Sequence, residues 1–98
     1  MTHEVSLHPL AEQELNDTAS YYNVASPGLG ATFLTEVERA LRQIREHPEA
    51  APVVHGVVRR KLVRRFPYSV MYSVQAETIR ILAIANQKRR PFYWRGRK

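Results

Sequence analysis

Cysteine is absent from this sequence of 98 residues. Its absence excludes disulfide bonds, thiolate nucleophiles and thiolate metal ligands together, and it fits the reducing cytoplasm, where we expect the protein to be located. Long apolar runs are missing as well, since no stretch approaches the roughly 18–20 apolar residues of a membrane span. The opening segment, MTHEVSLHPL, lacks a basic part followed by an apolar one, so we expect no signal peptide and no membrane partner.

Acidic residues are nearly missing from the second half of the chain. Residues 1–49 contain eight Asp and Glu and three Arg, whereas residues 50–98 contain twelve Lys and Arg and a single acid, Glu77. Because like charges repel unless something pairs with them, so many cations favour a polyanion or an acidic protein as partner. Composition alone does not choose between nucleic acid, an acidic lipid surface and an acidic protein.

The motifs of common metal and nucleotide sites are also missing. The four histidines, His3, His8, His47 and His55, are scattered without i, i+4 spacing, so we predict no metal site. The Gly-Leu-Gly segment at 28–30 follows a helical pattern and lacks the third glycine of a dinucleotide loop. The sequence has neither a P-loop nor the nucleophile elbow of a serine hydrolase. We expect no cofactor.

Apolar spacing in the first half predicts one strand and two helices. Glu4–Leu7 alternates polar and apolar residues, as a short strand does. Pro9 suits the first turn of a helix, whose apolar stripe is Ala11, Leu15, Ala19 and Tyr22. We expect Ser26 to cap a second helix with Pro27 at its first position, and its stripe is Leu29, Phe33, Val37, Ala40, Leu41 and Ile44. Pro48 ends this helix, and the two form a helical hairpin.

The second half changes to the period of strands. A loop precedes a strand over 57–63, Tyr68 to Val74 alternates, and the turn at 75–77 leads into a strand over 79–85. In that last strand we expect Ala83 and Ala85 to share the face of Ile79 and Ile81, opposite Leu82 and Ile84.

The order β-α-α-β-β-β predicts an α+β fold, with an antiparallel sheet and the helical hairpin packed on one face. The length indicates one domain, 1–98, with the hairpin at about 9–47, a β-meander at about 57–86 and a basic tail at 87–98. We expect the second face of the sheet to be partly open and to carry many of the basic side chains.

Three basic clusters dominate the predicted sheet: 59–61, 64–65 and 88–90. In an antiparallel meander they would lie close together, and with Tyr68, Tyr93 and Trp94 nearby they could neutralise phosphates and stack on bases. The same patch could instead hold an acidic segment that folds as it binds. Tyr68 and Tyr72 are equally good core residues. We expect the helix acids to face solvent: Glu12, Glu14, Asp17, Glu36 and Glu38.

Metal-free RNA cleavage needs a base, a cation and an acid around the scissile phosphate. Arg65 could supply the cation and Tyr93 the proton. A good base is harder to find, because Asn86 does not titrate and His55 and Lys61 are weak candidates.

Three blocks of this sequence, taken in order, resemble the ParE/RelE toxin superfamily. Residues 19–22, ASYY, the PGLG turn at 27–30 and the apolar positions of 33–44 resemble its helical hairpin. The segment RRFPYSVMY at 64–72 resembles its central strand, and ILAIANQKRRPFYW at 81–94 resembles its C-terminal block. The resemblance extends from about Pro9 to Trp94 and preserves the order and spacing of these blocks. The long hairpin with its PGLG turn is closer to the ParE-like members.

The resemblance implies the growth-inhibitory toxin of a bacterial type II toxin–antitoxin system. It also implies a cognate antitoxin whose acidic C-terminal segment wraps the toxin. ParE-like members poison DNA gyrase, and RelE-like members cut mRNA on the ribosome. Many members carry His after the last strand, where this chain has Asn86, so the resemblance favours a gyrase inhibitor that is not an enzyme.

Two alternatives remain open: an mRNA endonuclease that uses Lys61, Arg65 and Tyr93, and a non-toxic module that only binds the antitoxin. For the antitoxin and the target we predict a basic binding surface that consists of Arg59, Arg60, Lys61, Arg64, Arg65, Lys88, Arg89, Arg90, Tyr93 and Trp94.

Overall fold

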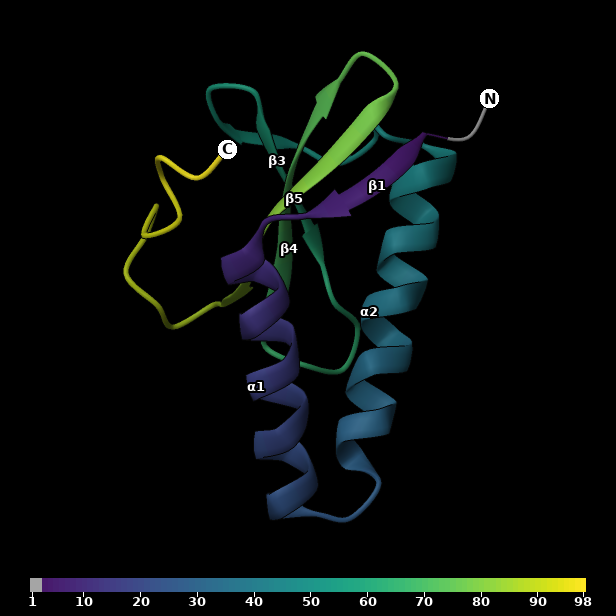
Figure 1. Ribbon diagram of the computed structural model, residues 1–98, viewed down its shortest axis with the longest axis vertical. Helices are drawn as coiled ribbons and strands as arrows, with labels where there is room; N and C mark the ends of the chain where they lie inside the picture. The colour runs from purple at the N-terminus through teal and green to yellow at the C-terminus, as the bar shows by residue number, and fades with distance from the viewer. Residues whose placement is uncertain (1–2) are drawn as a thin grey trace.

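A computed structural model of the chain describes residues 3–98, so the first two residues of the predicted domain lie outside the described part. Two long helices stand side by side and extend beyond one end of a five-stranded sheet (Figure 1). The elements in chain order are β1 (Glu4–Leu7), α1 (Pro9–Ala25), α2 (Leu29–Glu46), β2 (Val53–His55), β3 (Val58–Leu62), β4 (Tyr68–Gln75) and β5 (Thr78–Asn86). The predicted α+β class and the helical hairpin on one face of the sheet are confirmed.

The sheet has the strand order β1-β5-β4-β3-β2 and is mixed rather than wholly antiparallel. β1 runs parallel to β5, with Glu4 opposite Thr78 and Leu7 opposite Ile81. Only long connections can join parallel neighbours, and here the helical hairpin and the meander lie between the two strands. The short strand β2, which falls in a segment predicted to be a loop, pairs with β3 at the other edge.

Side chains other than the predicted cap satisfy backbone N–H groups at the start of both helices. His8 caps α1, because its Nδ1 accepts a hydrogen bond of 3.0 Å from the N–H of Leu10. The predicted cap of α2 by Ser26 is wrong. α2 starts at Leu29, after Gly28, whose φ of 89° is unfavourable for a residue with a side chain. The side-chain oxygen of Asn23 in α1 accepts a 2.8 Å hydrogen bond from the N–H of Gly30.

Gly30 allows the two helices to approach each other closely. A Cβ built on Gly30 would lie 2.3 Å from the carbonyl oxygen of Ala19 and 2.7 Å from Cγ of Asn23. Backbone atoms cannot yield to such a contact, so position 30 excludes any side chain at this helix separation.

The larger core lies between the helical hairpin and the sheet. Phe33, Val37 and Ile44 of α2 pack against Val70 and Tyr72 of β4, and each of them is almost fully buried. Tyr72 donates a 2.7 Å hydrogen bond to the carbonyl of Pro48, which satisfies its hydroxyl. Tyr22, Phe33, Phe66 and Tyr68 form an aromatic cluster under the β3–β4 loop, with ring centroids 5.0–6.2 Å apart.

A β-bulge in β5 changes which side chains face the helices. Tyr72 pairs with Ile81, whereas its neighbour Met71 pairs with Ala83, so Leu82 is an additional residue without a partner in β4. The bulge shifts the alternation by one residue. Ala83 and Ala85 therefore lie with Leu82 on the far face, and Ile84 joins the helix-facing core, contrary to the faces predicted by simple alternation.

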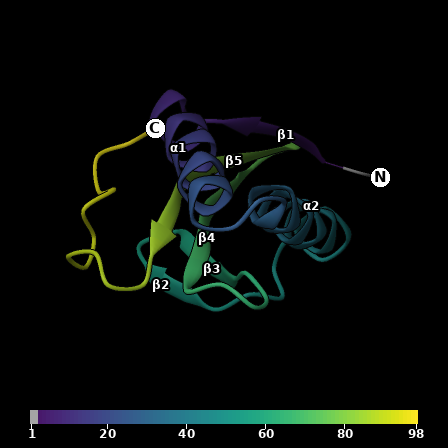
Figure 2. The same ribbon diagram turned by 90° about the horizontal axis from the view of Figure 1, so that it is seen from below.

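The C-terminal tail, residues 87–98, covers the far face that we expected to be partly open (Figure 2). The tail forms consecutive turns, and its Trp94 is only 5% exposed. Trp94 packs against a second apolar cluster, Val58, Met71, Leu82, Ala83 and Ala85. The face is covered because the bulge concentrates apolar side chains on it, and these must be removed from water.

Candidate functional site

The β3–β4 loop and the first residues of the tail bring two of the basic clusters to one end of the sheet. Tyr68 pairs with Asn86, so β4 begins where β5 ends. The N–H of Gln87 donates a 2.9 Å hydrogen bond to the carbonyl of Pro67, which ties the tail to the loop. The exposed residues Arg64 and Arg65 therefore lie beside the equally exposed cluster at 88–90.

Arg65 is presented by a strained backbone. Its φ is 72°, in the left-handed region that non-glycine residues seldom adopt. The hydrogen bonds from Val63 N–H to Tyr68 O and from Tyr68 N–H to Phe66 O close the loop around it. Phe66 points into the core, so the neighbouring Arg65 is left on the outside.

The third basic cluster, on β3, is divided between the two faces of the sheet. Arg59 and Lys61 pair with Tyr72 and Val70, whose side chains face the helices, and Arg60 pairs with Met71 on the far face. The guanidinium of Arg59 donates hydrogen bonds of 2.9 and 2.7 Å to the carbonyls of Glu49 and Ala51. Arg59 thus connects the loop after α2 to β3.

The aromatic residues of the predicted surface belong to the packing of the tail. Trp94 is buried, and the Tyr93 hydroxyl donates a 2.8 Å hydrogen bond to the Glu14 carboxylate. The guanidinium carbon of Arg89 lies 3.9 Å from the centroid of the Tyr93 ring, a cation–π contact. Tyr93 and Trp94 therefore hold the tail, while Arg89 and Arg90 remain at its surface.

The three residues predicted for an RNA-cleaving site do not converge. Lys61 is on β3 with its side chain on the helix-facing side, Arg65 is in the β3–β4 loop, and Tyr93 is on the far face. Burial, and then the hydrogen bond to Glu14 and its negative charge, raise the pKa of Tyr93 far above its usual value. Tyr93 is therefore a weaker acid than an ordinary tyrosine, and its hydroxyl is already engaged in the hydrogen bond to the Glu14 carboxylate.

Asn86 organises the turn at the end of β5. Its amide donates a 3.2 Å hydrogen bond to the Tyr68 hydroxyl, and its carbonyl oxygen accepts a 2.8 Å hydrogen bond from the N–H of Lys88. The amide and the carbonyl oxygen of Asn86 thus hold the start of the tail against β4.

Two of the acids predicted to face solvent are withdrawn from it. The carboxylate of Glu14 accepts hydrogen bonds from Tyr93, from both terminal nitrogens of Arg97 and from the N–H of Ile84. Glu36 is 6% exposed and has Arg39 at 3.8 Å. Helical periodicity placed both residues off the apolar stripe, but it could not show that the tail would bind Glu14 or that Glu36 would be buried.

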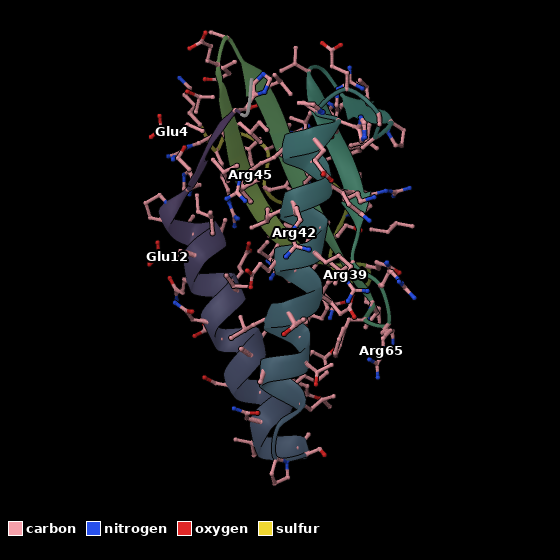
Figure 3. The ribbon with its side chains drawn as sticks, turned by 90° about the vertical axis from the view of Figure 1, so that its right-hand side faces the viewer. Glu4, Glu12, Arg39, Arg42, Arg45 and Arg65 are labelled. Carbon is pink, nitrogen blue, oxygen red and sulfur yellow. The ribbon has the colours of Figure 1, made fainter. Side chains whose placement is uncertain are left out.

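An arginine stripe on α2 extends the basic surface onto the helical hairpin, although residues 1–49 contain more acidic than basic residues. Arg39, Arg42 and Arg45 follow one another along α2, and Arg65 lies on the same side of the molecule (Figure 3). Arg42 and Arg45 are exposed, and the Arg39 side chain is 43% exposed. Their spacing of three residues is the signal that could have revealed one face.

Within residues 3–98, neither helix is long and apolar enough to cross a lipid bilayer. The same part of the chain contains no group of three or more His, Asp or Glu side chains placed to hold a metal ion.

Comparison with known families decides what kind of protein carries this geometry. Residues 5–91 match the model of the ParE toxin of type II toxin–antitoxin systems, parDE. The chain belongs to the ParE toxin family. Among solved structures, it is similar to a chain described as the chromosomal ParDE toxin–antitoxin system from P. aeruginosa, with a TM-score of 0.76 and 18% identity. That similarity covers 87% of this ParE-family chain and 96% of the other, and it establishes the shared fold. No curated protein matches the sequence.

Proposed function

We propose that this ParE-family toxin inhibits DNA gyrase and is neutralised by a cognate antitoxin. The observation that carries the proposal is the family match over residues 5–91. The separation of Lys61, Arg65 and Tyr93 supports a gyrase target over RNA cleavage, because general acid–base catalysis needs its groups within hydrogen-bond reach of one phosphate.

The antitoxin is proposed to place an acidic segment along the arginine stripe of α2 and the β3–β4 loop. This surface presents Arg42, Arg45, Arg64 and Arg65 to solvent. Within residues 3–98, the only ion pairs join Arg39 to Glu36 and Arg97 to Glu14, so these four exposed arginines carry no internal counter-charge. An acidic partner would supply it, and complementary charge would also speed association.

Purified toxin tests the gyrase proposal directly when it is added to gyrase, plasmid and ATP. We expect inhibited supercoiling or trapped cleaved DNA, together with intact mRNA when the toxin is induced in cells. Unaffected gyrase at micromolar toxin would contradict the proposal, and codon-positioned cuts in mRNA would replace it by the nuclease alternative.

The antitoxin surface is tested with two charge-matched double variants. Arg42→Gln with Arg45→Gln should weaken antitoxin binding about tenfold or more and reduce its salt dependence, because each charge-assisted contact contributes about 1.5–3 kcal/mol. Arg95→Gln with Lys98→Gln removes the same charge from the exposed end of the tail. Equal weakening by both variants would show that net charge alone, and not this surface, attracts the antitoxin.

A further inference from the structure

A separate pocket lies on the far face of the sheet, between the strands and the tail that crosses them. It has a volume of about 250 Å³ and opens among residues of β3, β4, the end of β5 and the tail. The residues that give it chemical character are Arg60, Ser69, Arg89, Arg90 and Phe92. None of these belongs to the α2 stripe, although Arg89 and Arg90 lie near the β3–β4 loop that forms the other part of the proposed antitoxin surface.

The Ser69 hydroxyl is the unexplained polar group in this pocket. Ser69 is 3% exposed, and its Oγ has no hydrogen-bond partner among the described residues. A buried hydroxyl without a partner destabilises the folded state, so native proteins seldom leave one unsatisfied. A ligand that accepts a hydrogen bond would remove this cost.

The lining of the pocket is strongly cationic. Arg60, Arg89 and Arg90 line it, and no acidic residue does. None of the three arginines forms an ion pair within residues 3–98. Arg89 is held in place by its contact with the Tyr93 ring, 3.9 Å from the centroid, so part of the cost of ordering a guanidinium is already met. Guanidinium groups bind phosphate oxygens in bidentate fashion, which makes a phosphate the best match.

An aromatic ring stands beside these arginines. Phe92 lines the same pocket and is 41% exposed, although its neighbour Trp94 is buried. Its ring lies 5.0 Å from that of His55, which supports it from one side. Nucleobases stack on such exposed rings. The volume is slightly below the roughly 300–1,000 Å³ of pockets for drug-sized ligands, which suits one nucleotide unit.

We propose that this pocket binds a single nucleotide unit, with the phosphate between Arg60, Arg89 and Arg90, hydrogen-bonded by Ser69, and the base on Phe92. The unit is either a free nucleoside monophosphate or one residue of an unpaired strand, since both present the same phosphate and base. Binding needs no bond making or breaking.

Fluorescence anisotropy with a labelled ten-residue oligothymidylate, and competition by thymidine monophosphate and by inorganic phosphate, test the proposal on the full chain. The double variant Arg60→Gln with Arg89→Gln should weaken oligonucleotide binding tenfold or more. Arg42→Gln with Arg45→Gln carries the same loss of charge on α2 and should change it less than threefold. If the monophosphate competes at concentrations near its own dissociation constant, the pocket is a free-nucleotide site. If the oligonucleotide binds but the monophosphate does not compete, the pocket binds one residue of a strand.

Ser69→Ala separates binding from folding. Because it removes the unpaired hydroxyl, we expect an unchanged or higher Tm together with weaker phosphate competition. Phe92→Leu should weaken the oligonucleotide and the monophosphate but not inorganic phosphate. Equal weakening by the two arginine double variants, no binding of any of the three probes, or unaltered binding by Ser69→Ala would each overturn the proposal. Inhibition of gyrase does not enter these measurements, so either proposal can fail alone.

Discussion

Glu14 is the residue on which the contacts of the C-terminal tail converge. Its carboxylate binds the Tyr93 hydroxyl at 2.8 Å and the Arg97 guanidinium at 2.9 and 3.1 Å. It also accepts the N–H of Ile84, in the part of β5 that β1 no longer pairs. Arg97 completes this edge by donating to the carbonyl of Leu82. One acid of α1 thus satisfies an open sheet edge and anchors the tail.

Replacing Glu14 by alanine should lower the free energy of unfolding by about 3 kcal/mol, since a partly buried charge network loses its only anion. For a domain of this size, that corresponds to a decrease in Tm of roughly 10–20 °C. Urea denaturation and calorimetry measure both quantities. Glu12→Ala, at an exposed position of the same helix, is the matched control and should change stability by less than about 0.5 kcal/mol. A loss of the same size in both variants would mean that the network contributes little.

At position 30, the contact between helices outweighs helix propensity. Alanine is better than glycine in a helix by about 1 kcal/mol, so Gly30→Ala would stabilise an isolated α2. In the folded protein its Cβ would lie 2.3 Å from the Ala19 carbonyl, and we expect a net loss of about 2 kcal/mol or more. Ala31→Gly, an exposed position of α2, should lose about 1 kcal/mol from propensity alone. A Gly30→Ala variant more stable than the native chain would refute the close approach of the helices.

At the scale of elements, the tail is a structural layer although it contains no helix or strand. It covers the apolar side chains that the bulge in β5 turns to the far face, and Trp94 is its largest buried residue. Its turns also line the proposed nucleotide pocket, together with residues of β2, β3, β4 and the end of β5. The tail therefore supports the sheet and shapes that pocket at once.

The single tryptophan, Trp94, reports on this layer without labelling. If the tail unfolds together with the rest, its fluorescence and the far-UV circular dichroism should give one urea transition with the same midpoint. We expect coincident transitions in the native chain and an earlier fluorescence transition in Glu14→Ala, because that variant loses the anchor. An earlier fluorescence transition in the native chain would show that the tail is detached before the core unfolds.

At the scale of the whole molecule, tyrosines make the free energy of unfolding depend on pH in the alkaline range. Burial raises the pKa values of Tyr22 and Tyr72, and burial with the nearby Glu14 raises that of Tyr93. In the unfolded chain these groups lose their protons near pH 10, whereas the folded chain still holds them. The unfolded state then binds fewer protons, so the free energy of unfolding is unaffected below that pH and falls above it.

We therefore expect urea midpoints to decrease as the pH rises above about 10. Tyr93→Phe has no proton to lose, so its midpoint should fall less steeply than that of the native chain over the same range. Midpoints measured between pH 8 and pH 11 compare the two, and Tyr21→Phe, at an exposed position, should follow the native curve. Parallel curves for Tyr93→Phe and the native chain would contradict the linkage.

The periodicity of apolar residues and the positions of prolines determined the local structure, and the sequence blocks indicated the family. Polar–apolar alternation predicted β1 at Glu4–Leu7, Pro9 marked the start of α1, and the helical stripes predicted the hairpin. These features depend on neighbours within about one turn of helix or one pair of strand residues, so sequence alone carries them. The blocks at 64–72 and 81–94 also preserve the order that the family match over 5–91 reflects.

The tertiary structure decided how these pieces share surfaces. A one-residue bulge at Leu82 reversed the faces of Ala83 and Ala85, the tail covered what alternation left open, and Glu14 became an internal anchor. The predicted basic surface was divided between two faces, and arginines of α2 joined one part of it. Each of these outcomes depends on contacts between residues far apart in the chain, where the burial of apolar area and the pairing of charge outweigh local preference.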